Sequence, residues 1–216
     1  MIETENTETD YIEISEADYI ADIRNTYRKA VGILRHCDDP EDALVWIDNH
    51  NYLSFFFRNI DIFRNRGFYE KGLFLALTMA NMQETRTNHS VDFILSLLNR
   101  ADRDKLKACG DVLTTDDPIQ VFRGITNRRN TRSIRRPSWT LRPETAAWFA
   151  MVCGRPLTRA NETSAVFRMM VPPEAIYFYT NHRGEEEVFL NPQMCGPAKQ
   201  VNPMPTPVKP KAPPEE

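Results

Sequence analysis

The stretch IQVFRGIT, at residues 119–126, marks the point where the pattern of the chain changes from helical to extended. It is rich in β-branched and aromatic residues, which are typical of strands. Further strands are predicted at 165–171, 175–180 and 186–190, and two consecutive prolines separate the first two of these. The second half of the chain is therefore expected to consist mainly of strands.

Upstream of this stretch, apolar residues recur at three- and four-residue steps, as they do on one face of a helix. A capping-box pattern at Ser15 opens the first such segment, which should end near His36. Asp39 and Pro40 are typical of a helix start and predict a short helix through Ile47. Three further helices and a last helical turn are expected at 53–63, 69–82, 91–98 and 106–110. The first half should thus be mostly helical.

Composition indicates a soluble, cytoplasmic protein. The chain has 216 residues with 27 basic and 30 acidic side chains, and 41% of its residues are hydrophobic, which is enough for a real core. No apolar run reaches the roughly 18 residues of a membrane helix, and the N-terminus lacks the features of a signal peptide. The four cysteines are widely spaced and form no CxxC pair. Reduced thiols are therefore expected, with no metal site and no membrane contact.

The chain divides into four parts by composition. Residues 1–14 are polar and acidic and should form a flexible arm. Residues 15–112 form the helical part and 113–196 the β core, and the two are predicted to make one globular unit of the α+β class. Residues 197–216 contain seven prolines and are expected to be an extended or disordered tail.

Two short motifs of the β core carry chemistry. Arg123 lies inside an apolar strand, and a buried arginine needs an anionic partner. Ser138 and Thr140 flank Trp139, so that the two-residue period of a strand places both hydroxyls on one face and the indole on the other. A helix that begins at Pro143 is predicted directly behind them.

A third motif is the run of three glutamates at the start of the last predicted strand. If the strand begins by Glu185, then Glu185 and Glu187 share a face and Glu186 points away. Paired carboxylates can stabilise an oxocarbenium-like centre or take a proton from an acceptor. The apolar residues 188–190 follow at once, so that Glu187 should be partly desolvated and its pKa raised.

Each motif also has a simpler interpretation. Arg123 could pair with a carboxylate at a sheet edge, and Ser-Trp-Thr is often a turn before a helix with a buried indole. Three consecutive glutamates are typical of a solvated loop. The order of the three motifs along the chain is what favours a functional site.

In this order the motifs resemble the R-S-E class of mono-ADP-ribosyltransferases. Their signature is an Arg on the first core strand, a Ser-x-Thr or Ser-x-Ser strand before a helix, and Glu-x-Glu near the end. The resemblance covers residues 118–192 and does not extend to the N-terminal helices. It implies a split antiparallel β-sandwich core with the helical half packed on it. It also implies NAD as co-substrate.

The resemblance assigns a first group of residues to the cofactor. Arg123 would bind an NAD phosphate with its planar, permanently charged guanidinium. Gly124 would let the backbone approach the nicotinamide amide. Arg155 or Arg159, in the loop after the helix, would hold the pyrophosphate. The aromatic residue that stacks on nicotinamide stays open among three candidates, which are Trp148, Phe149 and Tyr179.

A second group would carry the reaction. Glu187 would bind the hydroxyls of the nicotinamide ribose and stabilise positive charge as the N-glycosidic bond breaks. Ser138 would orient this carboxylate, and Thr140 would support the same strand. Glu185 would face the nucleophile, and a glutamate at this place accompanies an arginine acceptor in the family. The turn at residues 180–184 would recognise the acceptor.

The resemblance thus implies transfer of ADP-ribose from NAD to a macromolecule, most directly to a protein arginine. A nucleic-acid acceptor is a further possibility, because one acid-free stretch is rich in arginine: Arg128, Arg129, Arg132, Arg135, Arg136 and Arg142. The same cluster supports an alternative function as a nucleic-acid-binding module. A third alternative is an inactive scaffold that resembles the enzymes in shape only.

Overall fold

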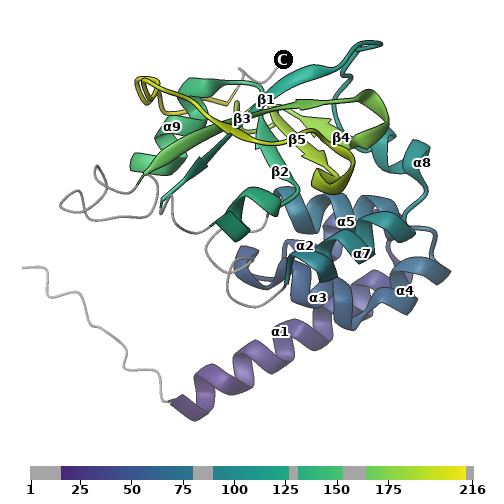
Figure 1. Ribbon diagram of the computed structural model, residues 1–216. Coiled ribbons are helices and arrows are strands. Elements are labelled where there is room, and N and C mark those ends of the chain that lie inside the picture. The colour runs from purple at the N-terminus through teal and green to yellow at the C-terminus, as the bar shows by residue number, and fades with distance from the viewer. Residues whose placement is uncertain (1–15, 80–89, 127–130, 153–163, 213–216) are drawn as a thin grey trace, which may run out of the picture.

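The computed structural model describes residues 16–79, 90–126, 131–152 and 164–212 and has a helical half and a β half. Figure 1 shows the helices of residues 16–100 gathered below a six-stranded antiparallel sheet. The predicted α+β class is confirmed. Within the described residues, no helix is both long and apolar enough to cross a lipid bilayer.

The helical half contains most of the predicted helices. Its helices are α1 (Glu16–His36), α2 (Glu41–Leu44), α3 (Tyr52–Arg58), α4 (Ile60–Asn65), α5 (Tyr69–Thr78), α7 (Val91–Arg100) and α8 (Arg103–Ala108). The single helix predicted at 53–63 is wrong, because Asn59 separates α3 from α4. The buried Asn59 amide donates to the Phe55 carbonyl and to the Tyr27 hydroxyl. Such side-chain bonds to the backbone compete with helix continuation.

Aromatic side chains join the helical half to the sheet. The ring of Phe74 on α5 lies 5.1 Å from that of Phe178, and the Tyr177 hydroxyl donates to Asn99 on α7. Tyr177, Phe178 and Phe189 are buried in the same apolar cluster as the helical core. The two halves therefore share one core.

The first five strands lie close to their predicted positions, whereas the sixth falls within the predicted tail and was not expected. They are β1 (Ile119–Ile125), β2 (Ser138–Thr140), β3 (Ala165–Val171), β4 (Ile176–Thr180), β5 (Glu187–Leu190) and β6 (Lys199–Gln200). Their order in the sheet is β4-β5-β2-β1-β3-β6. The helix α9 (Pro143–Met151) follows β2, as predicted, and packs on β1.

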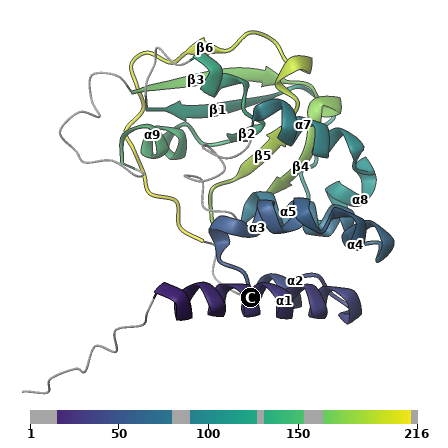
Figure 2. The ribbon, with the colours of Figure 1, turned by 90° about the horizontal axis from the view of Figure 1, so that it is seen from below.

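The sheet is almost interrupted between β1 and β2. These strands pair only at Phe122 and Thr140, whereas β1 and β3 pair along their whole length. If the pairing continued in the same register, Gly124 would lie opposite Ser138. At this point no backbone pair is formed between the two strands, and the Arg123 side chain donates to the Ser138 carbonyl. Figure 2 shows β4 and β5 running at a steep angle to β1 and β3. The predicted sandwich is thus one continuous sheet with a split at β1–β2.

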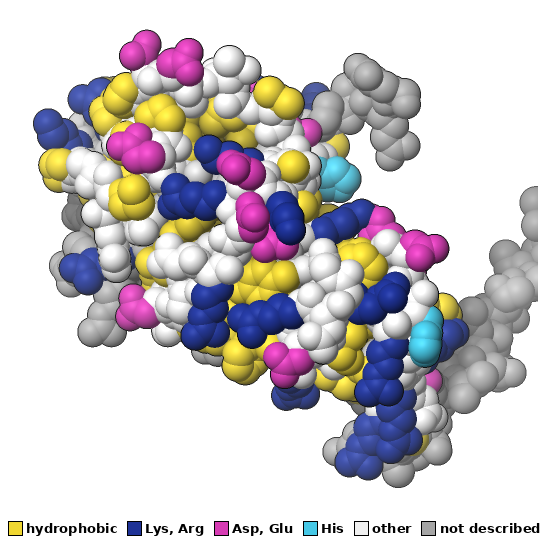
Figure 3. All heavy atoms as spheres, turned by 90° about the vertical axis from the view of Figure 1, so that its right-hand side faces the viewer, with side chains coloured by type: hydrophobic (Ala, Val, Ile, Leu, Met, Phe, Trp, Pro, Cys, Tyr) yellow, Lys and Arg dark blue, Asp and Glu magenta, His cyan; other side chains and the backbone are white. Residues whose placement is uncertain are grey.

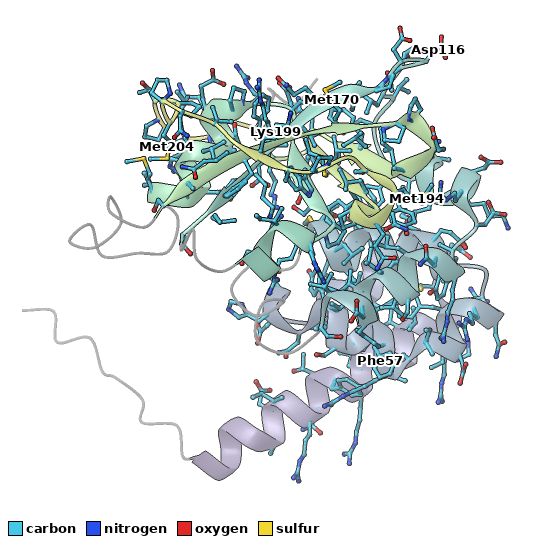
Figure 4. The ribbon with its side chains drawn as sticks, viewed as in Figure 1. Phe57, Asp116, Met170, Met194, Lys199 and Met204 are labelled. Carbon is cyan, nitrogen blue, oxygen red and sulfur yellow. The ribbon has the colours of Figure 1, made fainter. Side chains whose placement is uncertain are left out.

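The C-terminal tail differs from the prediction of a disordered end. β6 pairs with the edge strand β3, and the amide of Val201 donates to the Val166 carbonyl. Val201 and Met204 pack against α9, and Lys199 and Met204 mark the course of the tail in Figure 4. Residues 197–212 follow the core because the edge of β3 offers free backbone partners and apolar residues lie between the prolines.

Candidate active site

A small pocket opens at the split between β1 and β2. Its volume is about 30 Å³, so that a ligand larger than one or two waters must lie across its mouth. The pocket is lined by Phe122, Arg123, Gly124, Ser138, Trp139, Thr140, Phe149, Glu185 and Glu187. These include the predicted residues Arg123, Gly124, Ser138, Thr140, Glu185 and Glu187, whereas Arg155 and Arg159 lie outside the described residues.

Strand register brings the hydroxyls to a buried carboxylate. Thr140 pairs with Glu187 across β2 and β5, so that Ser138 is the diagonal neighbour of Glu187 on the same face. The Ser138 hydroxyl donates to Oε1 of Glu187, which is 5% exposed. The indole of Trp139 is buried on the opposite face, as the two-residue period predicts.

Glu185 reaches the pocket by a different route from the one predicted. β5 begins only at Glu187, and Glu186 has a left-handed φ of 46°. The Thr140 hydroxyl donates to the Glu185 carbonyl, and the amide of Leu141 donates to the Glu186 carbonyl at 3.0 Å. A turn anchored on β2, rather than a strand, therefore sets the two pocket carboxylates side by side. The Glu186 carboxylate turns away to Arg142, 3.5 Å distant.

Arg183 lies between the two carboxylates, a contact that the sequence interpretation missed. Its Nη2 is 2.9 Å from Oε2 of Glu185 and 3.8 Å from Oε2 of Glu187. The prediction placed Arg183 only in an acceptor-recognising turn. The signal available was its spacing, two residues before one glutamate and four before the other.

Arg123 is 8% exposed and is held by backbone carbonyls. Its Nε donates to the Ser133 carbonyl at 2.8 Å, and its Nη1 donates to the Ser138 carbonyl. The guanidinium thus ties β1 to β2 and to the turn at Thr131–Arg135. Its predicted contact with a phosphate stays a prediction.

Close packing against α9 requires a glycine at position 124, a role that the sequence interpretation did not include. A Cβ at this position would overlap the carbonyl oxygen of Ala146 and would lie 2.8 Å from the amide nitrogen of Ala150. The absence of a side chain is what lets α9 approach β1. The predicted approach of the Gly124 backbone to nicotinamide is a separate role, which stays a prediction.

Of the aromatic candidates, Phe149 lines the pocket, together with Phe122, which the prediction did not consider. Trp148 contacts Phe149 edge-on, with ring centroids 5.1 Å apart. Tyr179 lies elsewhere and lines a larger cleft toward the helical half.

Burial has the largest effect on the pKa values of the two glutamates in the pocket. Desolvation, and next the negative charge of Glu185, raise the pKa of Glu187 from 4.5 to about 7. The Ser138 hydrogen bond and the charges of Arg183 and Arg123 oppose this rise. The pKa of Glu185 is also raised by burial, against the attraction of Arg183.

The raised pKa of Glu187 predicts that the free energy of unfolding decreases as pH rises. The folded chain binds this proton more tightly than the unfolded chain, so the stabilisation is full below about pH 4.5 and is lost as pH rises through about 7. The loss should be about 3 kcal/mol of unfolding free energy. Urea denaturation across this range measures it. In Glu187→Gln most of the fall should disappear, and an unchanged fall would contradict the assignment to Glu187.

No family model, curated protein or solved structure matches this chain. Across the described parts of the chain, no group of three or more His, Cys, Asp or Glu residues could hold a metal ion. The pocket is lined by the buried carboxylate of Glu187, the largely buried carboxylate of Glu185, the Arg123 guanidinium and the hydroxyls of Ser138 and Thr140, with the Arg183 guanidinium in contact with both carboxylates. This arrangement is suited to stabilising positive charge and accepting a proton.

Proposed function

We propose that the chain is a mono-ADP-ribosyltransferase that cleaves NAD at the bond between nicotinamide and ribose and transfers ADP-ribose to a protein arginine. The observation that carries this proposal is the buried Glu187, which accepts a hydrogen bond from Ser138 and lies beside Glu185 at the split of the sheet. The three motifs that suggested the family meet in this one pocket.

Glu187 is the main charge stabiliser in this proposal. As the bond from nicotinamide nitrogen to C1′ breaks, positive charge develops on the ribose, and a carboxylate in a desolvated site stabilises it strongly. Ser138 orients the carboxylate. Because the pKa of Glu187 is about 7, a cationic ligand next to it favours the ionised form that the reaction requires.

The cofactor contacts follow from the lining of the pocket. Phe149 and Phe122 provide ring faces for nicotinamide. Arg123 provides a guanidinium for a phosphate, and one of its backbone contacts would then be exchanged for the ligand. Since the pocket is small, the rest of NAD would extend along the split beyond it.

Glu185 completes the transfer step. The bond from C1′ to nicotinamide breaks with its electron pair leaving on nicotinamide, and a bond forms from C1′ to a guanidinium nitrogen of the acceptor. That nitrogen gives its proton to Glu185. Burial raises the pKa of Glu185 and makes this carboxylate a stronger base than an exposed one.

Nicotinamide release from NAD tests the proposal. The purified chain should release nicotinamide slowly with water as acceptor and faster with a small guanidine such as agmatine. A folded chain that binds NAD without releasing nicotinamide would leave the inactive scaffold as the better function.

Glu185→Gln separates transfer from hydrolysis. Transfer to agmatine should fall about a hundredfold, because the base for the guanidinium proton is lost, and hydrolysis should fall less than about tenfold. Both rates come from one incubation, in which nicotinamide and ADP-ribosyl-agmatine are quantified together. Equal losses in the two rates would deny Glu185 a role in accepting the acceptor's proton.

The nucleic-acid alternative has weaker support in the described residues. Arg142, from the arginine-rich stretch, forms an ion pair with Glu186, which lies 44 residues further along the chain. Lys and Arg side chains do gather at the lower end of the face in Figure 3, where the helical half lies. Retention of DNA that falls steeply with salt and survives Glu187→Gln would favour this alternative.

A further inference from the structure

A guanidinium of the chain itself occupies the place where the proposed reaction needs its nucleophile. Nη2 of Arg183 donates to Glu185 at 2.9 Å and lies 3.8 Å from Glu187. Glu185 is the proposed proton acceptor and Glu187 the proposed ribose ligand. If the proposed function holds, a nitrogen in contact with both carboxylates would lie next to C1′ of bound NAD.

The backbone around Arg183 holds this position. Gly184 has a left-handed φ of 68°, and its amide donates to the Asn181 carbonyl at 2.8 Å. The Asn181 side chain accepts from the amide of Glu186 at 3.2 Å. A Cβ at Gly184 would overlap the carbonyl of Lys211, so the tail packs directly on this turn. The turn thus presents the Arg183 side chain from a defined direction.

The other arginines described near the pocket are placed differently. Arg123 donates to two backbone carbonyls, and Arg142 pairs with Glu186 outside the pocket. The Arg183 side chain is 35% exposed and lines a separate cleft of about 1110 Å³ between the helical half and the turn at 180–184. It therefore lies between solvent and the two carboxylates, where an external acceptor would have to enter.

We propose that Arg183 is itself an acceptor, so that the chain transfers one ADP-ribosyl group from NAD to its own Arg183. This inference rests on the proposed function. The C1′–nicotinamide bond breaks, a bond forms between C1′ and Nη2 of Arg183, and the Nη2 proton passes to Glu185. The products are nicotinamide and the modified chain.

Mass spectrometry of the full chain after incubation with NAD tests the proposal. The parent should gain one ADP-ribosyl group, and electron-transfer fragmentation should place it on Arg183. Arg183→Lys keeps the positive charge between the carboxylates and should gain none at that position. Arg142→Lys is the matched control, an arginine of the neighbouring loop whose partner is Glu186, and it should be modified like the parent.

A mixing experiment tests whether transfer occurs within one chain. Glu187→Gln chains, which retain Arg183 but lack the charge stabiliser, are incubated with NAD and active Arg183→Lys chains. They should remain unmodified, and the modified fraction of the parent should not depend on its concentration. Modification of the Glu187→Gln chains would overturn transfer within the chain.

The remaining outcomes separate this inference from the proposed function. Nicotinamide release with residue 183 unmodified would overturn the inference and leave the transferase function standing. Equal modification of the parent and Arg183→Lys would also overturn it. Absence of nicotinamide release would overturn both.

Discussion

Glu187→Gln should lower the rate of nicotinamide release from NAD by about a hundredfold or more, because it removes the negative charge nearest the developing oxocarbenium ion. The glutamine is almost isosteric and stays neutral, so that the pocket should keep its shape. It can still accept a hydrogen bond from Ser138, which donates to Glu187 in the parent. The rate is measured at saturating NAD, with circular dichroism to verify folding.

Glu186→Gln is the matched control for this variant. Glu186 is the adjacent glutamate, but its carboxylate pairs with Arg142 and does not line the pocket. Its replacement should change the rate by less than about fivefold, since a largely exposed ion pair contributes at most about 1 kcal/mol. Equal rates for the parent and Glu187→Gln would end the proposed function.

Gly124→Ala should lower the free energy of unfolding by about 3 kcal/mol, without any ligand present. The added Cβ meets backbone atoms of Ala146 and Ala150, which cannot rotate away as a side chain could. α9 would have to shift away from β1, and the pocket lined by Phe149 would change with it. Urea denaturation of the ligand-free chain measures this loss.

Gly32→Ala is the control for the glycine substitution. Gly32 lies on an exposed position of α1, and a Cβ there would have nothing within 4 Å. Alanine at this helical position should stabilise the chain by about 0.5–1 kcal/mol. If Gly124→Ala were as stable as the parent but bound NAD poorly, Gly124 of the parent would be needed for ligand binding rather than for the packing of α9.

Local patterns in the sequence were sufficient for much of the secondary structure. β1 and α9 lie where the β-branched run and the proline start predicted them. The faces of Ser138, Thr140 and Trp139 also follow from the strand period. The break at Asn59 was not predicted, and its amide also donates to the Tyr27 hydroxyl, a contact 32 residues away along the chain that no local pattern indicates.

By itself, then, the sequence determined the element types, the α+β class and the set of residues from which a site could form. These depend on the period of apolar residues and on turn signals within a few positions of each other. Only the tertiary structure decided that Arg183 lies between Glu185 and Glu187, that α9 packs on Gly124, and that the tail follows β3. Those contacts depend on strand register and on turns such as the left-handed Glu186, which no short stretch of sequence specifies.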